Sequence, residues 1–82
     1  MIVESFDIQG PMLIKPRIFK DDRGYFLETY HQKNYQQHGI GPLFVQDNHS
    51  YSTKGVVRGM HYQVHHAQDK LVFVNKGKIQ DI

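Results

Sequence analysis

The 82-residue sequence contains no cysteine, no long apolar run and no basic stretch at its N-terminus. The lack of cysteine excludes disulfides and fits a reducing compartment. No segment approaches the roughly 20 apolar residues of a membrane span, and the first residues lack the basic and apolar regions of a signal peptide. We therefore expect a cytoplasmic protein that does not enter the membrane.

Strong charge of either sign is also missing. Ten Lys and Arg residues face eight Asp and Glu residues, giving a net charge of +2. The basic residues alternate with acidic ones rather than forming the stripe that is typical of nucleic-acid-binding proteins. In the aromatic-rich segment 24–31, which we expect to be a strand, Phe26 shares its face with Glu28, whose carboxylate would repel phosphate. We expect no nucleic-acid partner, and the balance fits either an ordinary mixed surface or a mildly positive pocket for a small anion.

The length predicts one small domain over residues 1–82. A chain this short buries only about 60% of the surface that its unfolded form exposes. A metal, a partner subunit or a further half of the domain is therefore expected to support it. The apolar alternation predicts these core residues: Phe6, Phe19, Phe44, Leu71, Val72, Phe73 and Val74.

Short β-like segments separated by turn residues predict an all-β, antiparallel sandwich or barrel. Residues 32–38 predict a short helix that ends at Gly39, and Gly41-Pro42 predicts a chain break. The pattern of residues 78–82 has no closing turn after it, so we interpret the chain as part of a domain or as one completed by a partner. The predicted strands are 12–19, 24–31, 43–52 and 55–63, then a hairpin of 70–74 and 78–82; turns are predicted at 21–24 and 75–77.

Polar side chains recur on the faces of these predicted strands. In a β-barrel, inward-facing polar residues line a ligand cavity; on an open sheet they form a solvated face. Both interpretations fit any one residue alone. The set comprises Arg23, Glu28, Gln46, Asn48, Arg58, His61 and Lys70.

The order of these residues resembles one enzyme family. The blocks DRGYFLE (22–28), FVQDNHS (44–50), VRGMHYQ (57–63) and KLV (70–72) follow one another as in the dTDP-4-dehydrorhamnose 3,5-epimerase family. The resemblance implies a partial cupin-like jelly roll that forms a homodimer. It also implies binding of dTDP-4-keto-6-deoxyglucose and inversion at C3 and C5, without a metal or redox cofactor.

The resemblance also implies roles for individual residues. His61 matches the general base, whose pKa near neutrality suits proton abstraction. Lys70 matches the cation near the C4 oxyanion, and Arg58 a residue that contacts this region or the phosphates. Arg23 and Phe26 match residues offered across the dimer interface. The resemblance implies that the nucleotide sugar is bound by Arg23, Phe26, Glu28, Gln46, Asp47, Asn48 and Arg58.

The sequence departs from the family pattern in two ways. The family's proton-donating tyrosine and the aspartate that orients the histidine have no counterpart here, and Asp69 stands where many members have glycine. An alternative is thus an inactive or truncated cupin that binds a sugar nucleotide but lacks the catalytic acid. A third hypothesis, a metal-dependent cupin, rests on His61, His65 and His66, but Gln63 stands where the second metal histidine of such proteins would be.

Overall fold

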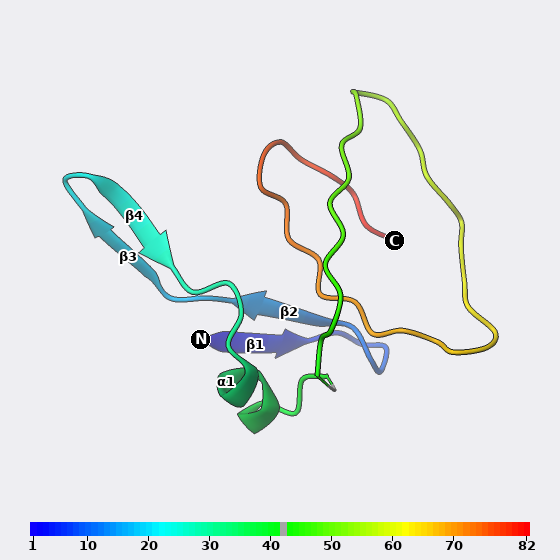
Figure 1. The fold of residues 1–82 in the computed structure, drawn as a ribbon, viewed down its shortest axis with the longest axis horizontal. Helices are drawn as coiled ribbons and strands as arrows, with labels where there is room; N and C mark the ends of the chain where they lie inside the picture. The colour runs from blue at the N-terminus through cyan, green and yellow to red at the C-terminus, as the bar shows by residue number, and fades with distance from the viewer. Residues whose placement is uncertain (42) are drawn as a thin grey trace. The chain divides into compact units, whose positions relative to one another are not determined.

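A computed structural model describes residues 1–41 and 43–82. The chain divides into two compact units, Met1–Leu43 and Phe44–Ile82. Within the described residues, all strands and the helix belong to the first unit (Figure 1). The Gly41-Pro42 break falls partly outside the described residues, because Pro42 is not among them.

Two antiparallel hairpins make up the strands of the first unit. Strand β1 (Ile2–Ser5) pairs with β2 (Met12–Lys15), and strand β3 (Ile18–Asp21) pairs with β4 (Gly24–Leu27) (Figure 1). All pairing is antiparallel, so the predicted all-β class is confirmed. The prediction of a single domain over residues 1–82 stays a prediction.

The predicted strand 12–19 is wrong as one continuous element. It forms two strands, β2 and β3, that pair with different partners on either side of Pro16. Proline has no N–H to donate to a strand partner, so the ladder stops where it stands. The partner of β2 is β1, a strand that the sequence pattern did not predict.

The turn predicted at residues 21–24 is confirmed as the connection between β3 and β4. Gly24 has φ of 138°, which a residue with a side chain rarely adopts. Strand β4 ends at Leu27, four residues before the predicted end of the strand. The chain leaves the sheet there because residues 28–31 lead into a helix.

Helix α1 (Gln32–Gln37) confirms the predicted short helix. At its C-terminus the N–H of Gly39 donates to the Gln36 carbonyl at 3.0 Å, and the N–H of Ile40 to the Tyr35 carbonyl at 2.9 Å. These two bonds define a Schellman motif, with Gly39 at φ 69° in its left-handed position. Tyr35 and Ile40 are 4% and 8% exposed and are the buried apolar residues of the described chain.

The predicted strands at 43–52, 55–63, 70–74 and 78–82 do not form. The described residues from 43 onward contain a backbone bond from the Val56 N–H to the Thr53 carbonyl, 3.3 Å long, but no strand. An extended segment becomes a strand only when it exchanges backbone hydrogen bonds with a neighbouring strand. The bend at 75–77, with Gly77 at φ 91°, does agree with the turn predicted there.

Most of the predicted core is exposed as well. Phe6 is 56% exposed and Phe73 is 58% exposed, and Phe44 is partly buried. A two-stranded hairpin cannot cover an apolar face without a second layer. The apolar alternation therefore identified strand faces that no second layer covers in the described residues.

Candidate functional site

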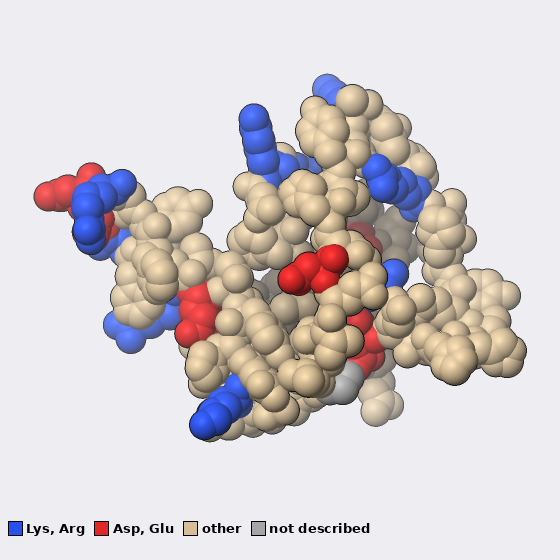
Figure 2. All heavy atoms as spheres, in the orientation of Figure 1, with Lys and Arg blue, Asp and Glu red and all other residues tan. Residues whose placement is uncertain are grey.

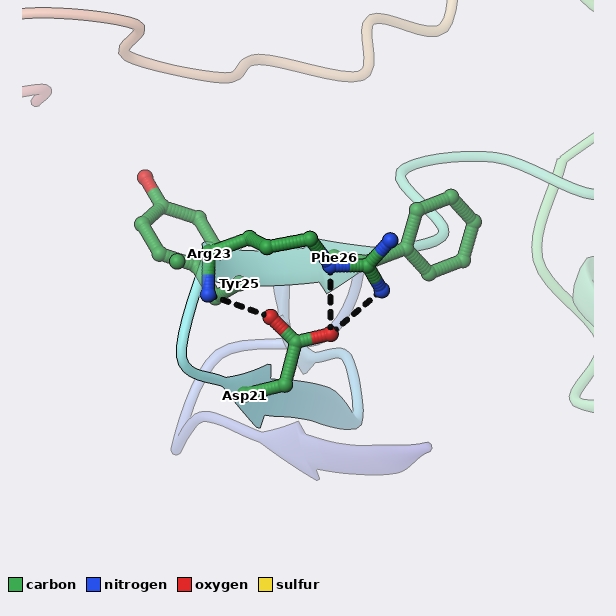
Figure 3. A pocket seen from close by; sticks show the side chains of 5 residues that line it. Asp21, Arg23, Tyr25 and Phe26 are labelled. Carbon is green, nitrogen blue, oxygen red and sulfur yellow. Dashed lines mark hydrogen bonds and ion pairs between the residues drawn. The ribbon is translucent and has the colours of Figure 1, made fainter.

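Arg23 lies in the β3–β4 turn, where Asp21 fixes its side chain (Figure 3). Asp21 Oδ1 accepts from the Arg23 backbone N–H at 2.9 Å, and Oδ2 accepts from Nε at 3.2 Å and Nη2 at 2.6 Å. These bonds, the side-chain ones first, lower the pKa of the Asp21 carboxyl from its usual 3.8. The guanidinium is thereby held at the tip of the hairpin while it stays largely exposed.

Charged side chains of both signs gather at this tip, as Figure 2 shows. Lys20, Asp21, Asp22 and Arg23 follow one another there in the sequence. The carboxylates of Asp21 and Asp22 offset the positive charge that Arg23 presents to an anionic ligand. Arg23 therefore offers directed hydrogen bonds, rather than a broad positive field, to an anion.

Phe26 lies on β4 directly opposite Phe19 on β3. Their ring centroids are 6.4 Å apart with an interplanar angle of 47°, and the Arg17 guanidinium lies 4.7 Å from the Phe19 centroid. Phe26 is 69% exposed. An exposed ring steadied from one side is suited to stacking on a planar ligand group.

The described residues of the first unit line at least two shallow hollows. Arg23 and Phe26 line one of them, so the structure brings these two predicted residues together (Figure 3). Glu28 instead lines a second hollow, next to Arg17 and Phe19. The residues that line the first hollow are Asp21, Arg23, Gly24, Tyr25 and Phe26.

The Glu28 carboxylate is bound by a residue that the sequence pattern did not single out. Asn34 on α1 donates from its side-chain amide to Glu28 Oε1 at 3.1 Å. Residues six apart do not touch along one continuous strand or helix, so no periodic pattern could have pointed to this pair. Only the turn between β4 and α1 brings them together.

In the second unit, Gln46 and Asn48 act as a pair. Gln46 Nε2 donates to Asn48 Oδ1 at 3.1 Å, as expected of residues two apart in an extended segment. Asp47, between them, is exposed. The Arg58 guanidinium donates from Nη2 to the Tyr51 carbonyl at 2.9 Å, which ties it to the neighbouring segment.

His61 and Lys70 are both exposed. Among residues 1–41 and 43–82, no hydrogen-bond partner is found for either side chain, so the imidazole is accessible to a ligand. Gln63 closes the loop that follows: its Oε1 accepts from the Gln68 N–H at 2.8 Å. His65 and His66 lie in a bend within this loop.

The described residues contain no group of three metal-binding side chains. They also contain no helix with the length and apolar character needed to cross a membrane.

Comparison with known proteins agrees with the order of the four sequence blocks. The model of the family described as dTDP-4-dehydrorhamnose 3,5-epimerase matches residues 5–82. The chain belongs to the dTDP-4-dehydrorhamnose 3,5-epimerase family. Its membership makes the described β-hairpins part of a cupin-like jelly roll. No solved structure matches the chain at a significant level.

Several epimerases of this family are similar to the chain. A dTDP-4-dehydrorhamnose 3,5-epimerase of Pseudomonas aeruginosa is 49% identical over 76 residues, which cover 92% of this chain and 42% of the relative. One of Escherichia coli strain K12 is 46% identical over 85 residues, covering 100% and 45%. One of Methanothermobacter thermautotrophicus is 44% identical over 75 residues, covering 92% and 40%. The chain thus spans less than half the length of these relatives.

Proposed function

We propose that this chain supplies the N-terminal part of the active site of a dTDP-4-dehydrorhamnose 3,5-epimerase. The substrate would be dTDP-4-keto-6-deoxyglucose, inverted at C3 and C5 on the route to dTDP-L-rhamnose. The observation that carries the proposal is the family match over residues 5–82, which includes every proposed site residue. The names of the relatives state the same activity.

The proposed reaction is proton removal and return next to a ketone. A C–H bond beside the C4 carbonyl is acidic enough to break when the resulting enolate is stabilised. His61 would remove the proton, because a neutral imidazole accepts protons near physiological pH. Lys70 would lie close to the C4 oxygen, where its positive charge favours the enolate over the ketone.

The remaining residues would hold the substrate in place. Phe26 offers an exposed ring to stack on the nucleotide base, and Arg23 directed donors for an anionic group. Arg58 would contact the phosphates or the C4 region. The amides and carboxylates that would bind the sugar and nucleoside are Glu28, Gln46, Asp47 and Asn48.

We further propose that the protein acts in the cytoplasm as a homodimer, with Arg23 and Phe26 offered to the partner's site. The exposed rings on the β3–β4 hairpin support this assembly, because a second copy would cover them. Neither a cofactor nor a nucleic acid is required for the chemistry. Sedimentation of the chain at several concentrations tests the dimer.

The activity is tested by solvent exchange. The chain is incubated with dTDP-4-keto-6-deoxyglucose in heavy water, and deuterium at C3 and C5 is followed by NMR. A chimera in which this chain replaces the matched segment of the E. coli relative is assayed in parallel. We expect deuterium incorporation in the chimera, and its loss in His61→Ala.

His49→Ala is the matched control, because His49 belongs to the same kind of extended segment but to no proposed role; it should keep full exchange. Exchange by the chimera with no exchange by the chain would mean that a working site needs the remaining part of the protein. A chimera that binds dTDP without exchange would favour a sugar-nucleotide-binding protein instead. A folded chimera that neither binds nor exchanges would reject the family activity for this sequence.

A further inference from the structure

Glu28 lies in the connection between β4 and α1, and a side chain of α1 contacts it. Its Oε1 accepts from the Asn34 side-chain amide at 3.1 Å. Both residues are exposed, so the bond adds little to the stability of the fold. Its effect is on direction: it restricts a flexible carboxylate to one side of the connection.

Asn34 is itself held at both of its backbone groups. Its N–H donates to His31 Nδ1 at 3.4 Å, and its carbonyl accepts from His38 Nδ1 at 2.8 Å. These bonds fix the point on α1 from which the Asn34 side chain extends. Asn34 can therefore orient another group.

Helix α1 is in turn fixed to the segment that carries Glu28. The Tyr35 hydroxyl donates to the Thr29 carbonyl at 2.7 Å, and the Tyr35 ring meets the Tyr30 ring edge-on at 4.8 Å. Tyr35 is buried, and the helix closes on it through the bond from the Ile40 N–H. Burial, and then the negative charge of Glu28, raise the pKa of the Tyr35 hydroxyl, which agrees with a carboxylate held beside the helix.

We propose that Asn34 is a positioning residue for ligand binding: it holds Glu28 Oε1 and leaves Oε2 to accept a hydrogen bond from the sugar nucleotide. The inference rests on the proposed function, since it takes Glu28 to be a ligand-binding residue. Asn34 does not touch the ligand. It acts by removing rotational freedom from Glu28 before the ligand arrives, which lowers the entropic cost of binding.

The contact is tested first in the free chain, without any ligand. In a ¹⁵N-labelled sample, the side-chain amide resonances of Asn34 should shift when Glu28 is changed to Gln. Glu4→Gln is the matched control, because Glu4 pairs with Lys15 at 2.7 Å on the other hairpin; it should leave these resonances in place. An unchanged Asn34 amide in Glu28→Gln would overturn the proposal at this step.

The role in binding is tested by a double-mutant cycle in the chimera with the E. coli relative, with dTDP as the probe. Asn34→Ala should weaken dTDP binding about three- to tenfold, the range of one hydrogen bond. In the Glu28→Ala background the same change should have no further effect, because the group to be positioned is absent. Gln36→Ala, an exposed neighbour on α1, should bind as the unsubstituted chimera does, and circular dichroism of the free chain should show α1 intact in every variant.

Two results would contradict the proposal in distinguishable ways. Losses that add in the double variant would mean that Asn34 supports the fold and does not act through Glu28. If the chimera with the E. coli relative fails to bind dTDP, the proposed function is wrong, and the ligand-binding role of Asn34 is wrong with it. The amide shifts of the free chain still separate that case from a missing contact.

Discussion

At the tip of the β3–β4 hairpin, Asp21 accepts three hydrogen bonds from one residue, Arg23. Two of them join a carboxylate to a guanidinium, the kind of hydrogen bond that is stronger than a neutral one. The same contact both orders the turn and aims a residue that we propose to bind substrate. At the scale of single residues, the structural and the functional roles of Arg23 therefore cannot be varied separately.

The Asp21 contact predicts an acid-sensitive turn. Because Arg23 lowers the pKa of Asp21 below 3.8 in the folded chain, the carboxylate supports the turn at any pH above 3.8. This support is lost as the pH falls through the lowered pKa. A ¹³C NMR titration of the Asp21 carboxyl should show the low value, and Arg23→Gln should move it up towards 3.8. Arg17→Gln, outside the turn, should leave it unchanged; a shift there would point to a general charge effect.

Tyr35 predicts a second, alkaline transition. Burial and the charge of Glu28 raise its pKa above the usual 10.0, so the folded chain favours the neutral phenol. The support that Tyr35 gives to α1 is complete below pH 10.0 and falls as the pH rises through the raised pKa. Absorbance at 295 nm should show one tyrosine that ionises later than the rest, and Tyr35→Phe should remove that step. Tyr62→Phe, on an exposed residue, should retain it.

At the scale of elements, the structure explains which sequence patterns succeeded. The turn at 21–24 and the helix that ends at Gly39 were predictable, because each depends on hydrogen bonds within a few residues. The strands after residue 43 were predicted from alternation, which marks faces but does not supply a partner. The Glu28–Asn34 contact was out of reach for a related reason: it depends on the path of the connection between β4 and α1.

The proposed base, His61, and the site residues of the first unit can share one site only through packing between residues far apart in the sequence. The sequence supplied the candidate residues and their chemistry through the resemblance to the family. No local pattern says how the faces that carry them come together. The site residues accordingly stay predictions, to be tested by exchange and binding.

The C-terminus of α1 gives a prediction for one element. Gly39→Ala should destabilise the helix by about 1 kcal/mol, because alanine is strained at φ 69°. Apart from its chain neighbours, no atom of the described residues lies within 4 Å of the added Cβ, so the cost is conformational and not a clash. Circular dichroism at 222 nm during denaturation measures the loss. Gln37→Ala, at the last residue of the helix and two residues before Gly39, should be neutral or slightly stabilising. An equal loss of stability there would show that the cap is not the cause.

At the scale of the whole molecule, backbone hydrogen bonds are unevenly distributed. The described bonds of the first unit include the two hairpins and the closed end of α1, whereas the second unit has a bond across its turn at 53–56. In an extended segment whose N–H and C=O groups are not paired with a neighbouring strand, the amides exchange with solvent with little protection. The segments that carry His61 and Lys70 therefore need pairing from elsewhere to hold a fixed geometry.

Amide hydrogen exchange measures this difference directly. In the chain alone, the Ile40 amide should be among the best protected, because it is bonded at 2.9 Å and its residue is buried. Amides of residues 45–82 should exchange close to the rate of an unfolded peptide, apart from those of Val56 and Gln68, which are hydrogen-bonded. In the chimera with the E. coli relative, the same residues should gain protection, because strands of the relative can then pair with them. If residues 45–82 are as well protected in the chain alone as in the chimera, the second unit orders itself. The proposed base, His61, and the lysine proposed to stabilise the oxyanion, Lys70, would then need no partner strands to be held in place.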